Sequence, residues 1–188
     1  MRKLIVISGV LILCMIASGG AYAEQPGLSV GVMTGYTGLT GDLKDNFNGD
    51  TPVGVRAGFW MDENMEAELS YFHNQFSPKH DRSGHLELDA LELAIRGQYT
   101  HRELIRPYIK GGAGYYIYNA TTNTPAEDAT SFGLLAGAGV DFVHLLSKSS
   151  EIGVGLEGKY SFIFKNETNG IDMGSNLYQV GFSLFLNF

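Results

Sequence analysis

From residue 28 to the last residue, hydrophobic side chains recur at every second position of the chain. A period of two is typical of β-strands with one face in an apolar environment, whereas helices repeat every three or four residues. The clearest case is the C-terminal stretch, where alternate residues form one apolar row: Tyr178, Val180, Phe182, Leu184, Leu186 and Phe188. The pattern therefore predicts an all-β protein.

Six further stretches alternate clearly, and a weaker one at the start makes eight: residues 28–36, 53–61, 65–71, 91–99, 109–117, 134–142, 152–162 and 178–188. The connections between them alternate between long and short: 37–52, 62–64, 76–86, 101–106, 119–131, 144–151 and 165–176. Short turns on one side and long loops on the other are typical of transmembrane barrels. We predict a transmembrane eight-stranded antiparallel up-and-down β-barrel over residues 24–188.

The polarity of the rows supports a membrane location. No central residue of an apolar row is charged, whereas the opposite rows carry Arg, Lys, Glu and Gly. In hydrocarbon every backbone N–H and C=O must be paired, and a closed sheet achieves this without helices. Aromatic residues near the row ends fit the interfacial girdles of such barrels: Tyr71, Tyr99, Phe142, Phe162, Phe164, Tyr178 and Phe188.

The N-terminal segment has the features of a secretory signal. Arg2 and Lys3 precede an apolar stretch over 4–16, and Ala21-Tyr22-Ala23 supplies a cleavage site. The apolar stretch is shorter than the ~20 residues that span a bilayer as a helix. We expect residues 1–23 to be a signal peptide that directs the chain through the inner membrane and is then removed.

Cysteine usage and charge narrow the function classes further. The single cysteine, Cys14, lies in the predicted signal, so the mature chain cannot be held by disulfides. Removing Arg2 and Lys3 moves the net charge from −7 to −9. Nucleic acid is excluded as a partner, because phosphate binding needs clustered basic residues.

Four stretches resemble the outer-membrane β-barrel superfamily, which includes the OmpA-type transmembrane domain and small porin-like proteins. They are GVRAGFWMDENMEAELSYF (54–72), RPYIKGGAGYYIY (106–118), GLLAGAGVDF (133–142) and VGLEGKYSF (154–162). The resemblance implies integration into the outer membrane of a Gram-negative cell envelope. It also implies that the C-terminal row ending at Phe188 is the signal read by the barrel-assembly machinery. The barrel pattern runs to the last residue, so we expect no peptidoglycan-binding domain.

The inward rows of the predicted barrel carry nine charged residues: Arg56, Glu66, Glu68, Glu92, Arg96, Lys110, Asp141, Glu157 and Lys159. An eight-stranded barrel is filled by its own side chains, so charges inside it must be paired. The main hypothesis is a structural network of ion pairs that closes the lumen. The alternative is a narrow pore, or a channel for small hydrophobic molecules. Inward glycines would leave room for Tyr108, Tyr116 and Trp60.

A lipid A-modifying enzyme is a remote alternative, because some barrels of this kind act on lipid A. The loop SPKHDRSGH groups His80, Asp81, Ser83 and His85, but spacing in a loop gives no catalytic orientation. We therefore predict no enzyme, no metal site and no cofactor.

The long loops at 41–50 and 121–130 are acidic and polar. We expect them to be solvated, with lipid and lipopolysaccharide as partners.

Overall fold

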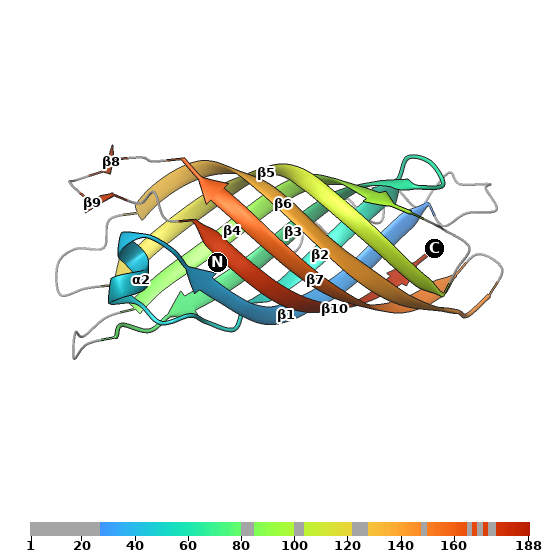
Figure 1. The fold of residues 1–188 in the computed structure, drawn as a ribbon, viewed down its shortest axis with the longest axis horizontal. Helices are drawn as coiled ribbons and strands as arrows, with labels where there is room; N and C mark the ends of the chain where they lie inside the picture. The colour runs from blue at the N-terminus through green and yellow to red at the C-terminus, as the bar shows by residue number, and fades with distance from the viewer. Residues whose placement is uncertain are drawn as a thin grey trace.

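A computed structural model describes residues 27–79, 85–99, 104–121, 128–147, 150–164, 167–168, 171–172 and 176–188. Eight long strands form a closed barrel: β1 (Leu28–Leu39), β2 (Val53–Trp60), β3 (Met65–Phe76), β4 (His85–Gln98), β5 (Ile105–Thr121), β6 (Asp128–Leu145), β7 (Glu151–Ile163) and β10 (Leu177–Asn187). The short strands β8 (Glu167–Thr168) and β9 (Ile171–Asp172) pair with each other, and α2 (Asp42–Asn46) is a single helical turn. The predicted eight-stranded barrel is confirmed (Figure 1).

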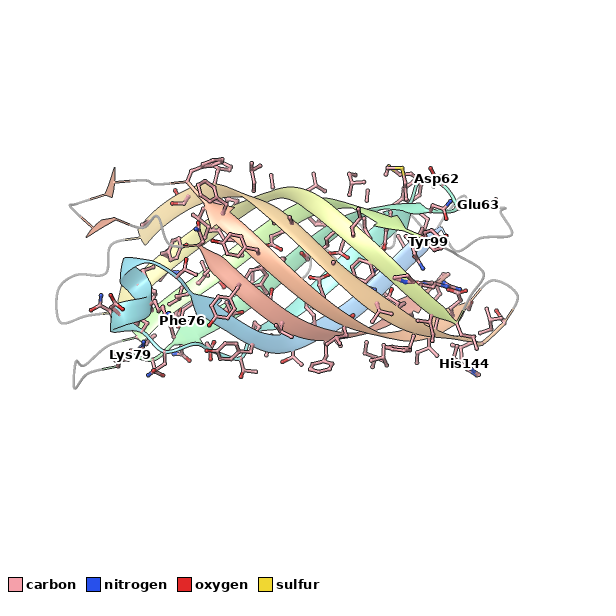
Figure 2. All side chains as sticks on the ribbon, in the orientation of Figure 1. Asp62, Glu63, Phe76, Lys79, Tyr99 and His144 are labelled. Carbon is pink, nitrogen blue, oxygen red and sulfur yellow. The ribbon has the colours of Figure 1, made fainter. Side chains whose placement is uncertain are left out.

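Each barrel strand pairs antiparallel with its sequence neighbours, and β10 closes the barrel on β1. The N–H of Gly27 donates to the carbonyl of Phe188 at 2.6 Å, so both chain ends of the barrel meet at one end. We call this the turn end, because the short connection at 61–64 also lies there. The opposite end, with α2, β8 and β9, is the loop end (Figure 1). Figure 2 labels Asp62 and Tyr99 at the turn end and Phe76 at the loop end.

The apolar rows face outward along the middle of every strand. On β4 and β5, the outward Leu93 and Ile109 are 60% and 70% exposed, whereas the inward Ala94 and Lys110 are 4% and 5% exposed. A soluble sandwich would bury such apolar rows and expose the charged ones. The exposed apolar belt is therefore the surface expected to meet hydrocarbon. None of the described helices is long and apolar enough to cross a membrane.

Near the loop end, the polarity of the two faces reverses, which the sequence analysis did not predict. On β4 the inward residues change from Glu92 to Ala90 and Leu88, while the outward residues change from Leu91 to Asp89. The buried side chains of this end form one apolar cluster: Leu39, Leu43, Phe72, Phe76, Leu86, Leu88, Ala90, Tyr116, Tyr118, Ala129, Ile163 and Leu177. On β3 and β4 this end therefore has mainly apolar side chains inside and polar side chains outside, as in a soluble protein.

The first long loop folds back over this apolar cluster. Leu43 of α2 is 7% exposed and belongs to the cluster, and Phe47 packs against it. Backbone hydrogen bonds join this loop to the start of the next, since the N–H of Asn48 donates to Ser77 and that of Lys79 to Asn46, both at 2.9 Å. The expectation of a solvated loop at 41–50 is therefore wrong for Leu43, whereas Lys44 and Asp45 are exposed. Apolar residues set between its acidic ones cover the barrel end.

Inward glycines give space to large neighbours. A Cβ on Gly114 would lie 2.6 Å from the hydroxyl of Tyr116, and one on Gly139 would lie 2.5 Å from ring atoms of Tyr108. These two tyrosines were expected to need such space. At Gly153 the nearest atoms belong to the ring of Phe185, which the sequence analysis did not anticipate. Inside the barrel, aromatic rings therefore pack against the backbone of glycine residues.

Candidate functional site

The centre of the barrel interior holds a chain of ion pairs around Glu68. Its carboxylate lies 3.3 Å from Nη1 of Arg56 and 2.8 Å from Nζ of Lys110. Lys110 also lies 2.8 Å from Oε2 of Glu157, which accepts a hydrogen bond from the Tyr108 hydroxyl at 2.9 Å. Side chains from β2, β3, β5 and β7 therefore meet across the lumen.

A second group surrounds Arg96 on β4. Its guanidinium donates to Asp141 on β6 and lies 3.6 Å from Oε2 of Glu66 on β3. It also lies over the ring of Tyr108, with Cζ 3.6 Å from the ring centroid. The Ser29 hydroxyl donates to the other oxygen of Glu66. The cation is thus held by two carboxylates and an aromatic face.

The third group lies next to the apolar cluster of the loop end. Nζ of Lys159 is 2.5 Å from Oε2 of Glu92, and the Tyr116 hydroxyl donates to Oε1 of Glu92 at 3.0 Å. Nζ of Lys159 also lies 4.3 Å from the ring centroid of Phe72. This pair therefore marks the boundary between the charged and apolar parts of the interior.

A fourth group, at the turn end, was missed from the sequence. Arg106 donates two hydrogen bonds of 2.7 Å to the carboxylate of Glu151, and the Asn187 amide donates to the same group at 3.0 Å. The sequence analysis placed both charged residues in turns, at 101–106 and 144–151, but they belong to β5 and β7. Arg106 lies four residues before Lys110, so extending the inward row would have found it.

Most of these pairs connect strands that are not neighbours in the barrel, whereas Arg56–Glu68 and Arg96–Glu66 join neighbouring strands. Arg96 and Asp141 join β4 to β6, and Lys159 joins β7 to β4. All nine residues of the predicted network form ion pairs, and each lies on the inward face. Because charges taken out of water cost several kcal/mol each unless they are paired, this arrangement favours a tightly held interior.

Most of the other candidate residues fall in a segment that the structure does not describe. His80, Asp81 and Ser83 lie outside the described residues, and His85 lies 3.5 Å from its neighbour Glu87. On the outer face near the loop end, His73 Nδ1 lies 2.8 Å from Asp89. The described part of the chain contains no group of three or more His, Cys, Asp or Glu side chains placed to hold a metal ion.

Comparison with known proteins bears on this arrangement. A family model described as an outer membrane protein beta-barrel domain matches residues 8–188. The chain belongs to this family. The resemblance inferred from the sequence is thereby confirmed, and the exposed belt and charged interior are features of an outer-membrane barrel. Among curated protein sequences none matches the chain.

Solved outer-membrane barrels have the same fold. Neisserial surface protein A has a TM-score of 0.68 at 13% identity, over 86% of this chain and 97% of that one. The N-terminal barrel domain of Pseudomonas aeruginosa OprF has a TM-score of 0.53 at 17% identity, over 85% and 97%. Yersinia pestis Ail, solved with the heparin analogue sucrose octasulfate, has a TM-score of 0.52 at 12% identity, over 85% and 94%. These identities indicate a shared fold only.

Proposed function

We propose that this protein is a structural barrel of the bacterial outer membrane with an interior closed to solutes. The observation that carries the proposal is the succession of paired charges and apolar side chains along the lumen. Four groups of ion pairs occupy it from the turn end to Glu92, and the apolar cluster covered by Leu43 follows to the loop end. A hydrated solute would have to displace paired charges and then cross buried aromatic rings.

The orientation follows from the two ends of the barrel. The turn end faces the periplasm and the loop end faces outward, because external loops of such barrels are the longer ones. We assign residues 1–23, which lie outside the described residues, to a cleaved signal peptide. We also propose that the C-terminal row from Tyr178 to Phe188 is read by the barrel-assembly machinery.

Lipid and lipopolysaccharide are the proposed partners of the outer wall. On the loop-end side of Leu91, the outward face carries Asp89. Its carboxylate accepts a hydrogen bond from the hydroxyl of Tyr71 at 2.6 Å and contacts His73. This face begins where the apolar belt ends, so it lies at the height of lipid headgroups. We propose that these groups serve this polar interface rather than catalysis.

Conductance in planar lipid bilayers tests the closed interior. The purified parent protein should give no steady channels above a small leak, and so should Glu92→Gln and Lys110→Met, which keep the side-chain volume. Correct folding of each variant is checked by the heat-dependent shift in gel migration that folded barrels show. Steady channels in the parent would contradict closure. Channels that open only in a variant would show that the ion pairs act as a gate of a narrow pore.

The enzymatic alternative has its own test. Lipid A from cells producing the parent, His85→Ala or His80→Ala is compared by mass spectrometry. We expect identical lipid A in all three and in cells without the protein. A modification that depends on the parent protein and is lost in either variant would overturn the structural assignment.

A further inference from the structure

The wall formed by β1 and β10 has little side-chain volume on its inner face. Gly35 on β1 lies directly opposite Gly181 on β10 in the strand register, and both face inward. A cavity of about 10 Å³ lies against this wall and is lined by Gly181, Met33, Arg56, Glu157 and Gln179, among others. A cavity of this volume is just large enough to hold one water molecule.

Two residues that line the cavity each carry a buried polar atom with no hydrogen-bond partner among the described residues. The two atoms are Nε of Arg56, a residue that is 4% exposed, and Oε1 of Gln179, which is 7% exposed. Other parts of the Arg56 guanidinium have contacts, since Nη1 lies 3.3 Å from Glu68 and Cζ lies 4.4 Å from the ring centroid of Phe185. Buried polar atoms are normally hydrogen-bonded to protein or to ordered water, so we expect a ligand beside these two atoms.

The chemistry of the lining specifies that ligand. Arg56 offers an N–H donor, whereas Gln179 and the carboxylate of Glu157 offer acceptors. An anion would face the Glu157 carboxylate, and a cation would face the Arg56 guanidinium. A neutral molecule of water size that both accepts and donates hydrogen bonds meets all three groups. Buried waters make about three such bonds.

We propose that this cavity binds one ordered water molecule, which accepts a hydrogen bond from Arg56 Nε and donates to Gln179 and Glu157. The three side chains belong to β2, β10 and β7. Because β1 lies between β2 and β10, the water connects side chains on both sides of the strand that closes the barrel. The site thus extends the ion-pair network across the junction of the first and last strands.

Water–protein cross-relaxation in nuclear magnetic resonance spectra tests the site. The ¹⁵N-labelled protein in lipid nanodiscs should give a rotating-frame cross-peak between water and the Arg56 Nε proton, with the sign that distinguishes it from chemical exchange. Gly181→Ala should abolish the cross-peak, because the added Cβ enters the cavity, 3.2 Å from the carbonyl oxygen of Thr34. Gln179→Met should weaken it by removing an acceptor.

Matched controls make the result specific. Gly158→Ala adds the same methyl group to the outer face, where a Cβ would meet no atom within 4 Å, and should leave the cross-peak unchanged. Gln98→Met removes a buried amide on β4 and should also leave it unchanged. Absence of the cross-peak in the parent, or its persistence in both cavity variants, would overturn the proposal. If adding chloride or ammonium changed the Arg56 Nε signal, the ligand would be an ion, and the proposal of a neutral ligand would be overturned. If Gly181→Ala does not fold, Gln179→Met still decides the outcome.

Discussion

Replacing Lys110 with methionine removes the ammonium group that holds both Glu68 and Glu157 at 2.8 Å, inside the barrel. Breaking a buried ion pair by removing one partner costs about 3–5 kcal/mol. In this variant Glu68 still pairs with Arg56, and Glu157 still accepts a hydrogen bond from the Tyr108 hydroxyl. We therefore expect a loss of stability at the lower end of this range, about 3 kcal/mol. With a slope of about 2 kcal/mol per molar urea, the unfolding midpoint should fall by about 1.5 M.

Urea unfolding from lipid vesicles measures this loss through the fluorescence of Trp60, the single tryptophan of the chain. Lys44→Met is the control, since Lys44 is exposed on α2 and such surface charges contribute about 0–1 kcal/mol. The double variant Glu68→Gln with Lys110→Met should lose less than the sum of the single variants, because it removes both partners. A midpoint for Lys110→Met equal to that of Lys44→Met, or additive losses in the double variant, would refute the reasoning.

Three further changes test other parts of the structure by the same unfolding assay. Leu93→Arg places a charge on the lipid-facing belt and should cost about 2–4 kcal/mol. Phe76→Ala removes a fully buried ring from the apolar cluster of the loop end and should cost about 3–5 kcal/mol. Gly153→Ala forces a methyl group against the ring of Phe185 and should cost about 1–3 kcal/mol, part of which Phe185→Leu should restore.

Each of these changes has a matched control elsewhere on the barrel. Gln75→Arg lies on the outer face near the loop end and should have little effect, because that face is polar. Phe132→Ala shortens a ring that is 66% exposed on the outer belt and should cost less than Phe76→Ala. Gly158→Ala adds a methyl group in open space and should be neutral. Equal losses in Leu93→Arg and its control would contradict the assignment of the apolar belt to hydrocarbon, and equal losses in either of the other two pairs would contradict the assignment of inner and outer faces.

The number of barrel strands and the face of each alternating row could be predicted from the sequence, because a period of two places successive residues on opposite faces. The rows around Leu93 and Ile109 are exposed and their neighbours are buried, as alternation requires. Alternation does not mark where the membrane ends. The same two faces continue from Leu91 to Asp89, and only the change in polarity reveals that the surroundings of the barrel have changed from hydrocarbon to water.

The ion-pair partner of each inward charge could not be predicted from the sequence, because it depends on the strand register and on how the barrel closes. Arg96 and Lys110 lie side by side on β4 and β5, so adjacent positions bring like charges together. Each of them pairs instead with carboxylates from other strands, and the partner of Arg96, Asp141, is 45 residues away in the chain. The sequence indicates that the nine predicted inward charges nearly balance, at four positive and five negative, but the closed barrel determines which of them meet.

Spin labels placed singly along β4 test the central claim, that one face of each strand meets hydrocarbon and that the polarity reverses near Leu91. The chain without its N-terminal segment has no cysteine, so each label reports one site. We predict that accessibility to oxygen is highest at positions 93 and 95, and that accessibility to a water-soluble nickel chelate exceeds it at positions 87 and 89. High nickel accessibility at position 93, or the highest oxygen accessibility at position 92, would contradict the account.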